Sequence, residues 1–160
     1  MGIEIERKFL LKNNDWKDLV TKTHVIKQGY LQSGMGASHK SSVRIRISND
    51  EANINIKSVE LKTVRQEFEY TIPLADAEQL LSTLCDESII EKTRYHVTFA
   101  SHLWEIDIFE GANKGLEIAE IELKDIDETF AVPGWIGPEV SDDERYYNIY
   151  LINTPYSMWT

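Results

Sequence analysis

Charged side chains of like sign recur at every second position along much of this chain, and this spacing constrains the fold more than any other feature. Successive side chains of a β-strand point to opposite faces, so residues at i and i+2 share a face. Apolar residues occupy the alternate positions, which predicts strands with one charged and one apolar face. The pairs of like charge are Glu4/Glu6, Arg44/Arg46, Glu67/Glu69, Lys92/Arg94, Glu105/Asp107 and Glu120/Glu122.

The alternation predicts eight strands, with three or four short helices between them. We expect the strands at residues 3–11, 24–32, 42–48, 53–59, 62–72, 90–99, 103–109 and 116–123. We expect helices after a cap at Asn13 or Asn14, from about Pro73 through Leu84, at about 125–130, and from a capping box formed by Ser141 and Glu144. Residues 34–38 and the segment around Trp135 are expected to be loops.

The charged faces admit two arrangements. For any single strand, the simpler interpretation is an open sheet whose polar face is solvated. Like charges side by side are mildly destabilising, however, and here they are doubled on strand after strand. The repetition favours a closed sheet whose charged faces point inward, where a ligand and water compensate them.

We therefore expect an α+β fold in a single domain spanning residues 1–160. Its centre would be a closed eight-stranded antiparallel β-barrel, a tunnel with a charged interior. A few short helices would pack outside and cover the apolar faces. This is the reverse of an ordinary small barrel, whose interior is filled with apolar side chains.

The composition restricts the partners and the compartment. The net charge is −10, from 27 acidic residues against 17 Lys and Arg, so the surface should repel nucleic acid and anionic membranes. No apolar run reaches the ~18–20 residues that span a bilayer, and the N-terminus lacks the apolar stretch of a signal peptide. The single cysteine, Cys85, excludes an internal disulfide and a multi-cysteine zinc site. We expect a cytoplasmic monomer or homodimer with no nucleic-acid or membrane partner.

The paired charges also indicate the class of ligand. Pairs of carboxylates offer the oxygen ligands that Mg²⁺ and Mn²⁺ prefer. Arg and Lys pairs suit phosphate oxygens, and Arg adds a planar fork of donors. Both charged sets on one inner surface predict a site for a complex of a divalent metal and a polyphosphate.

A series of short charged motifs runs along the chain and begins with Glu4-Ile5-Glu6-Arg7-Lys8, an ExExK pattern. The later segments are Gln28-Gly29-Tyr30-Leu31, Arg44-Ile45-Arg46, Ile56-Lys57-Ser58, Arg65-Gln66-Glu67-Phe68-Glu69, Glu91-Lys92-Thr93-Arg94-Tyr95, Glu105-Ile106-Asp107 with Phe109, Glu120-Ile121-Glu122 and Asp143-Glu144-Arg145-Tyr146. In these motifs and in their order, over nearly the whole chain, the sequence resembles the CYTH superfamily, also called the triphosphate tunnel metalloenzymes, whose signature is ExExK.

The resemblance implies an eight-stranded antiparallel tunnel, a requirement for Mg²⁺ or Mn²⁺, and a substrate that bears a triphosphate. Family activities include inorganic tripolyphosphatase, thiamine triphosphatase, RNA triphosphatase and class IV adenylate cyclase. The compact N-terminal motif is most similar to the short bacterial tripolyphosphatases. The expected reaction is in-line attack of water on a terminal phosphoryl group of tripolyphosphate, which yields diphosphate and phosphate.

The resemblance also suggests roles for individual residues, which we state as hypotheses. The candidate metal ligands are Glu4, Glu6, Glu120, Glu122 and Asp107. The candidate catalytic residues are Glu69, Asp107 and Glu122, which would position a second metal through its waters or orient the attacking water, together with Lys92. The candidate phosphate-binding residues are Lys8, Arg44, Arg46, Lys57, Arg65, Lys92, Arg94 and, from the closing helix, Arg145.

One segment departs from the family pattern. Relatives often carry a lysine near Arg145, whereas here Tyr146-Tyr147-Asn148 follows it. The contacts to the terminal phosphate are therefore open at this stage. Lys62 and Lys114 are further loop candidates, although lone lysines are usually only solvated.

Other functions stay open on the sequence alone. An adenylate cyclase would make cyclic AMP from ATP, with the triphosphate in a different register and an adenine pocket that no sequence element announces. A thiamine or nucleoside triphosphatase would use the same charged faces. A polyphosphate or nucleotide sensor would bind without turnover, and the full set of carboxylates argues against it.

Overall fold

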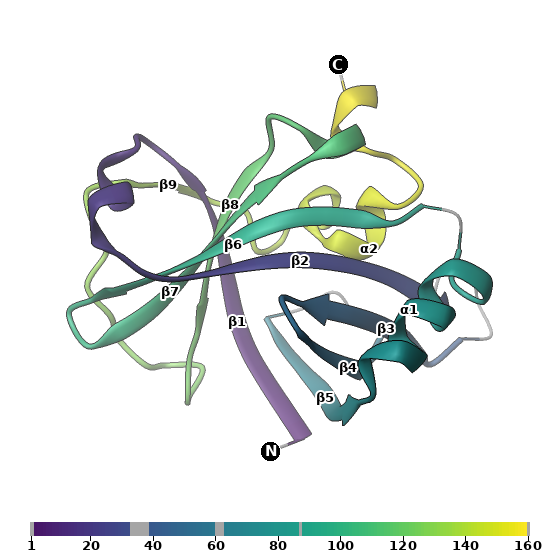
Figure 1. Cartoon of the computed structure of the whole chain (residues 1–160). Helices are drawn as coiled ribbons and strands as arrows, with labels where there is room; N and C mark the ends of the chain where they lie inside the picture. The colour runs from purple at the N-terminus through teal and green to yellow at the C-terminus, as the bar shows by residue number, and fades with distance from the viewer. Residues whose placement is uncertain (1, 33–38, 60–62, 87, 160) are drawn as a thin grey trace.

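A computed structural model of the chain describes residues 2–32, 39–59, 63–86 and 88–159 (Figure 1). The loop expected at 34–38 and the candidate Lys62 lie outside the described residues. Within those ranges, nine strands form one antiparallel sheet. They are β1 (Gly2–Leu11), β2 (Val20–Gln32), β3 (Ser41–Ser48), β4 (Glu51–Ser58), β5 (Val64–Ile72), β6 (Ile90–Phe99), β7 (His102–Phe109), β8 (Glu117–Glu122) and β9 (Ile136–Glu139).

Eight of these strands close into the predicted barrel. The hydrogen-bonded order is β5-β4-β3-β2-β6-β7-β8-β1, and a further pairing of β5 with β1 joins the two edges. The long β1 closes the ring because its two halves have different partners. Residues 2–5 pair with β5, whereas residues 6–10 pair with β8. The short β9, which the sequence pattern did not predict, pairs with the end of β1 outside this ring.

The alternation of residues sorts charged side chains from apolar ones as expected. On β1, Glu4 and Lys8 are buried on the inner face, whereas Phe9 is buried on the outer face. Phe9 packs there against Trp104 of β7, with the ring centroids 5.6 Å apart. The strands thus present their apolar side chains to packing partners outside the barrel.

Apolar clusters cover two parts of the outer surface among the described residues. One gathers Trp16, Trp104 and Trp135 with neighbours from β1, β6, β7 and β8. The other packs Ala77 and Leu81 of helix α1 (Leu74–Thr83) against β3 and β4. These clusters supply the hydrophobic burial that a charged barrel interior cannot.

A third apolar cluster closes one end of the barrel interior. Ile90, Phe109 and Ile118 lie on the same strand faces as Lys92, Asp107 and Glu120, each two positions away on its strand. Leu151 and Ile152 of the C-terminal segment, residues 141–159, complete this cluster. The charged interior is therefore blocked by apolar side chains at the end where the C-terminal segment lies.

The helices are short; the one at residues 74–83 packs outside the strands, whereas the one at residues 148–151 lies at the closed end of the barrel. None that the structure describes is long and apolar enough to cross a membrane. The α-helices are α1 (Leu74–Thr83) and α2 (Asn148–Leu151); the 3₁₀ helices are η1 (Asp15–Leu19), η2 (Gly111–Asn113), η3 (Glu144–Tyr146) and η4 (Tyr156–Met158).

Two of the predicted helices are wrong. Residues 125–130 form a short turn followed by irregular backbone, because Asp125 accepts a hydrogen bond from the backbone of Asp127 and Glu128 accepts one from the backbone of Lys124. The capping box at Ser141 does not form either. The Ser141 hydroxyl instead accepts a hydrogen bond from the Lys8 backbone at 3.0 Å, so the chain first turns helical at η3.

Gly29 on β2 provides a test of the packing beneath α1. A Cβ atom at this position would lie 2.7 Å from Ile89 Cδ1 and 3.1 Å from Leu81 Cδ2. We expect Gly29→Ala to lower the free energy of unfolding by about 1–3 kcal/mol, because the neighbours must shift to admit the methyl group. Urea denaturation measures the change. The control is Gly134→Ala, where no heavy atom lies within 4 Å, and equal stability of the two variants would contradict this packing.

Candidate active site

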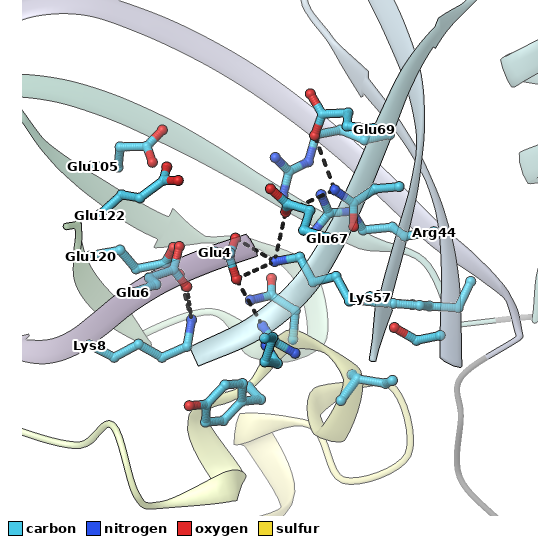
Figure 2. A pocket seen from close by; sticks show the side chains of 18 of the residues that line it. Glu4, Glu6, Lys8, Arg44, Lys57, Glu67, Glu69, Glu105, Glu120 and Glu122 are labelled. Carbon is cyan, nitrogen blue, oxygen red and sulfur yellow. Dashed lines mark hydrogen bonds and ion pairs between the residues drawn. The ribbon is translucent and has the colours of Figure 1, made fainter. Parts of the chain in front are cut away.

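The barrel encloses a charged cavity of about 330 Å³ (Figure 2). All but two of the residues predicted for the site line it, and the exceptions are Asp107 and Arg145. Glu67 and Glu105 also line the cavity; both lie on the predicted charged faces but had no assigned role. The predicted residues in the lining are Glu4, Glu6, Lys8, Arg44, Arg46, Lys57, Arg65, Glu69, Lys92, Arg94, Glu120 and Glu122.

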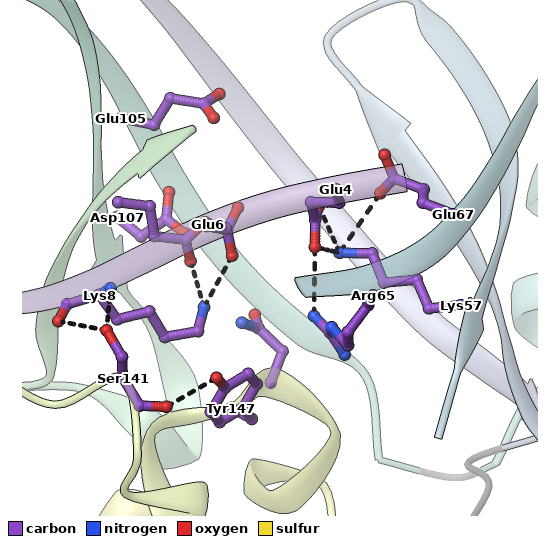
Figure 3. A network of polar contacts seen from close by, with 12 residues as sticks. Glu4, Glu6, Lys8, Lys57, Arg65, Glu67, Glu105, Asp107, Ser141 and Tyr147 are labelled. Carbon is purple, nitrogen blue, oxygen red and sulfur yellow. Dashed lines mark hydrogen bonds and ion pairs between the residues drawn. The ribbon is translucent and has the colours of Figure 1, made fainter. Parts of the chain in front are cut away.

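Glu4 is held by two cations from neighbouring strands. Lys57 donates to both carboxylate oxygens of Glu4 at 3.0 and 2.9 Å, and Arg65 approaches one of them at 3.4 Å (Figure 3). Burial by itself raises the pKa of Glu4, but the charges of Lys57 and Arg65 outweigh it and bring the pKa to about 2. Glu4 is therefore a fully ionised carboxylate.

Glu6 and Glu120 share one ammonium group. Lys8 Nζ lies 2.7 Å from Glu120 Oε1 and 3.3 Å from Glu6 Oε1. Burial and the charge of Glu120 raise the pKa of Glu6 to about 8. Burial and the charge of Glu4 likewise raise the pKa of Glu122. This side of the cavity has more negative charge than its lysine can neutralise.

Arg44 and Arg46 create the opposite imbalance on β3. Burial, followed by the charges of Arg44 and Arg94, lowers the pKa of Arg46 to about 9. Among the described residues, the buried Nε of Arg44 has no hydrogen-bond acceptor. A buried donor without an acceptor is costly, so this side of the cavity is suited to an anion.

Asp107 lies beneath the cavity wall rather than in it. Its side chain is 0% exposed, and it accepts from Lys92 at 2.6 Å and from Arg94 Nε at 2.7 Å and Nη2 at 2.8 Å. Burial lowers the pKa of Lys92, and so do the positive charges of Arg94 and Arg46. Together these effects outweigh the charge of Asp107, which raises the pKa, and the result is a pKa of about 7. Both oxygens of Asp107 are engaged in this way, so Asp107 supports two cavity cations, and its role as a metal ligand stays a prediction.

Arg145 also lies away from the position expected for it. It is 53% exposed and pairs with Asp143 at 2.7 Å, while its guanidinium group lies over the Tyr146 and Trp159 rings. Asp143 caps η3 by accepting from the Arg145 backbone, which keeps the two residues together on the surface. Arg145 therefore does not reach the cavity in which a phosphate would bind.

The C-terminal segment contributes residues that the charge pattern did not reveal. The Tyr147 ring faces two cations, with Lys8 Nζ 4.9 Å and the Arg65 guanidinium carbon 5.4 Å from its centroid. Its hydroxyl donates to the Ser141 carbonyl at 2.8 Å, which fixes the ring (Figure 3). Neither Tyr147 nor the adjacent Asn148 belongs to a repeating pattern. The only sequence signal for them was that Tyr146-Tyr147-Asn148 departs from the family motif.

With this geometry established, comparison with known proteins identifies the family. The sequence profile of the CYTH domain matches residues 2–150. This chain belongs to the CYTH domain family. An inorganic triphosphatase of Acetivibrio thermocellus is 42% identical over 156 residues, which cover 98% of this chain and 97% of that protein. An inorganic triphosphatase of Nitrosomonas europaea is 33% identical over 148 residues, covering 91% and 93%.

The CYTH fold is confirmed by a solved structure as well. The crystal structure of an inorganic triphosphatase, 31% identical, matches with a TM-score of 0.63 over 93% of each chain. The predicted closed antiparallel barrel with few helices is thus the fold of the family, with β9 as an additional strand.

The CYTH family implies a divalent metal, and the chemistry of the cavity fits one. Within the described residues, no group of three or more His, Cys, Asp or Glu side chains is already gathered for coordination. The cavity does supply an excess of carboxylate oxygens around Glu6, Glu120 and Glu122. Burial and neighbouring carboxylates raise the pKa values of Glu6 and Glu122, a charge imbalance that a divalent cation would relieve, and oxygen ligands suit Mg²⁺ or Mn²⁺.

We expect Asp107→Asn to lower the free energy of unfolding by about 3 kcal/mol, because Lys92 and Arg94 would lose a fully buried counter-charge. Chemical denaturation measures this change. The matched control is Asp143→Asn, which weakens a largely exposed ion pair, keeps an acceptor for the η3 cap, and should cost under ~1 kcal/mol. Similar losses in the two variants would show that Asp107 is not a buried support.

Glu6→Gln should instead stabilise the metal-free CYTH domain, by about 1–2 kcal/mol near pH 8. The folded-state pKa of Glu6 is about 8, above its ordinary value of 4.5, so its contribution to stability is lost as pH rises between these values. The gain from the substitution should therefore be absent near pH 4 and grow toward pH 8. Thermal denaturation across this range measures it. Glu4→Gln, on the same strand, should destabilise, and a stability gain there would contradict the charge assignment.

Proposed function

We propose that this CYTH domain hydrolyses inorganic tripolyphosphate to diphosphate and phosphate. The observation that carries the proposal is the enclosed cavity in which clustered bases and clustered carboxylates face one another, each set incompletely neutralised. The identity of 42% to an inorganic triphosphatase over nearly the whole chain supports the same function. Thiamine triphosphate, nucleoside triphosphates and cyclase chemistry remain outcomes of the test below.

The size of the cavity favours a small inorganic substrate. Its volume of about 330 Å³ lies at the lower end of the about 300–1,000 Å³ typical of ligand pockets. The apolar cluster around Phe109 and Leu151 occupies one end of the barrel interior, which disfavours an organic group there. A compact polyanion fits these limits better than a nucleotide does.

The basic residues would hold the phosphate chain. Arg44 and Arg46 form a region of positive charge with an unsatisfied buried donor, and Arg94 lies beside them. Lys8, Lys57 and Arg65, now paired with carboxylates, can exchange part of these contacts for phosphate oxygens. Positioning and charge neutralisation supply most of the acceleration in phosphoryl transfer.

Glu4, Glu6, Glu120 and Glu122 are the proposed ligands of Mg²⁺ or Mn²⁺. When bound, such a metal neutralises the charge that develops on phosphate oxygens. Glu69 and Glu122 lie on the side of the cavity away from the C-terminal segment, and we assign them to orienting the attacking water (Figure 2). Lys92 is proposed to stabilise the phosphoryl group that is transferred, with Asp107 fixing its position.

The composition supports two further proposals. A net charge of −10 argues against a nucleic-acid partner, and we retain the cytoplasm as the proposed location. For the oligomeric state we retain the proposal of a monomer or a homodimer.

The test is an assay of the purified protein with tripolyphosphate, ATP and thiamine triphosphate, each with Mg²⁺ or Mn²⁺. We expect orthophosphate release to be fastest from tripolyphosphate and to stop when EDTA removes the metal. Cyclic AMP formed from ATP, or metal-dependent binding of tripolyphosphate without turnover, would overturn the proposal.

Variants connect this activity to the cavity. Arg44→Ala should lower kcat/KM by about a hundredfold or more, because it removes a charged donor from the anion site. Arg145→Ala, which removes an arginine that the structure places on the surface, should stay within about twofold of wild type. Equal losses in the two variants would place the phosphate outside the described cavity.

A further inference from the structure

We infer that Asn148 is a further substrate-binding residue, whose side-chain Nδ2 donates to a terminal phosphate oxygen at the closed end of the cavity. The inference rests on the proposed function and deepens it, because it assigns a residue to the phosphate group that lies farthest from the opening. Asn148 is the first residue of α2 and lines the cavity.

Two donors fix the orientation of the Asn148 amide. Its Oδ1 accepts from Lys92 Nζ at 3.0 Å and from Gln28 Nε2 at 3.1 Å. An ammonium group can only donate, so the atom facing Lys92 must be the oxygen. Gln28 is fixed in the same way, because its Oε1 accepts from Arg46 Nε at 2.9 Å. The two amides form a chain between two cavity cations, and neither can flip without losing a charged partner.

This orientation leaves the Nδ2 group of Asn148 available. Within the part of the chain that the structure describes, Nδ2 donates no hydrogen bond to another protein group. Because the carboxamide is planar, fixing Oδ1 against Lys92 and Gln28 turns Nδ2 to the other side of the group. A residue in the cavity wall that presents an unused donor is suited to an anionic oxygen.

The neighbours of Asn148 define which phosphate it would contact. Tyr147 holds Lys8 and Arg65 over its ring, so adjacent residues of the C-terminal segment meet three cavity cations. Beyond Asn148, Phe109 and Leu151 belong to the apolar cluster that closes the barrel. A phosphate group bound here has no space behind it for an organic substituent, so the site selects an unsubstituted terminal phosphate.

Two substitutions at Asn148 distinguish a role in binding phosphate from a role in holding Lys92 and Gln28 in place. Asn148→Asp keeps an acceptor for Lys92 and Gln28 but replaces the Nδ2 donor with an anionic oxygen. Asn148→Ala removes both the donor and the acceptor. Asn153→Asp is the matched control, because it adds the same charge to the same segment at an exposed position outside the cavity lining.

The experiment measures the Kd of inorganic tripolyphosphate by calorimetry in EDTA, and KM and kcat with Mg²⁺. We expect Asn148→Ala to weaken binding about tenfold, Asn148→Asp to weaken it a hundredfold or more, and Asn153→Asp to change it less than about twofold. The melting temperature of Asn148→Asp should stay at or above that of wild type, since the acceptor for Lys92 is kept.

A merely supporting role predicts the reverse order, with Asn148→Asp close to wild type and Asn148→Ala impaired, and this result would overturn the inference. Wild-type affinity in Asn148→Ala would overturn it as well. If the wild-type protein binds tripolyphosphate without hydrolysing it, the proposed function fails, while the order of the Kd values still decides the role of Asn148.

Discussion

Mutual neutralisation of ionised side chains inside the barrel is the interaction on which the rest of this structure depends. A buried charge is tolerated only when an opposite charge and hydrogen bonds lie close to it. Lys57 with Glu4, Lys8 with Glu120, and Lys92 with Asp107 meet this condition, and each pair joins different strands. Because ion pairs occupy the barrel interior, the stabilising apolar contacts must lie on the outer faces of the strands and at the closed end of the barrel.

The neutralisation is incomplete in two places, and these places define the site. Arg44 and Arg46 have more positive charge than their surroundings balance, and Glu6 with Glu122 have more negative charge. A fully paired interior would be more stable but would have nothing to gain from a ligand. The excess positive charge suits a polyanion, and the excess negative charge suits a divalent cation. The same unbalanced charges therefore lower the stability of the fold and give it the capacity to bind a ligand.

The sequence predicted what depends on local periodicity and missed what depends on distant partners. Alternation alone put Glu4, Arg44 and Lys92 on inner strand faces, because a strand has a side-chain period of two. The helix start at Ser141 failed because its hydroxyl bonds to the backbone of β1, more than a hundred residues away. Asp107 shares its strand face with Glu105, and no pattern distinguishes the residue beneath the wall from the one that lines it. Asn148 carries no periodic signal, since its partners come from β2 and β6.

The C-terminal segment gives the cavity a direction. It closes one end with Leu151 and Ile152 and places Tyr147 and Asn148 against the deepest cations. The carboxylates Glu69, Glu105 and Glu122 lie at the side away from this segment (Figure 2). These carboxylates add to the net charge of −10 in opposing the approach of a bare polyanion. A divalent cation that screens the phosphates would reduce this repulsion, so the distribution of charge in the cavity would favour the metal complex over the free polyanion.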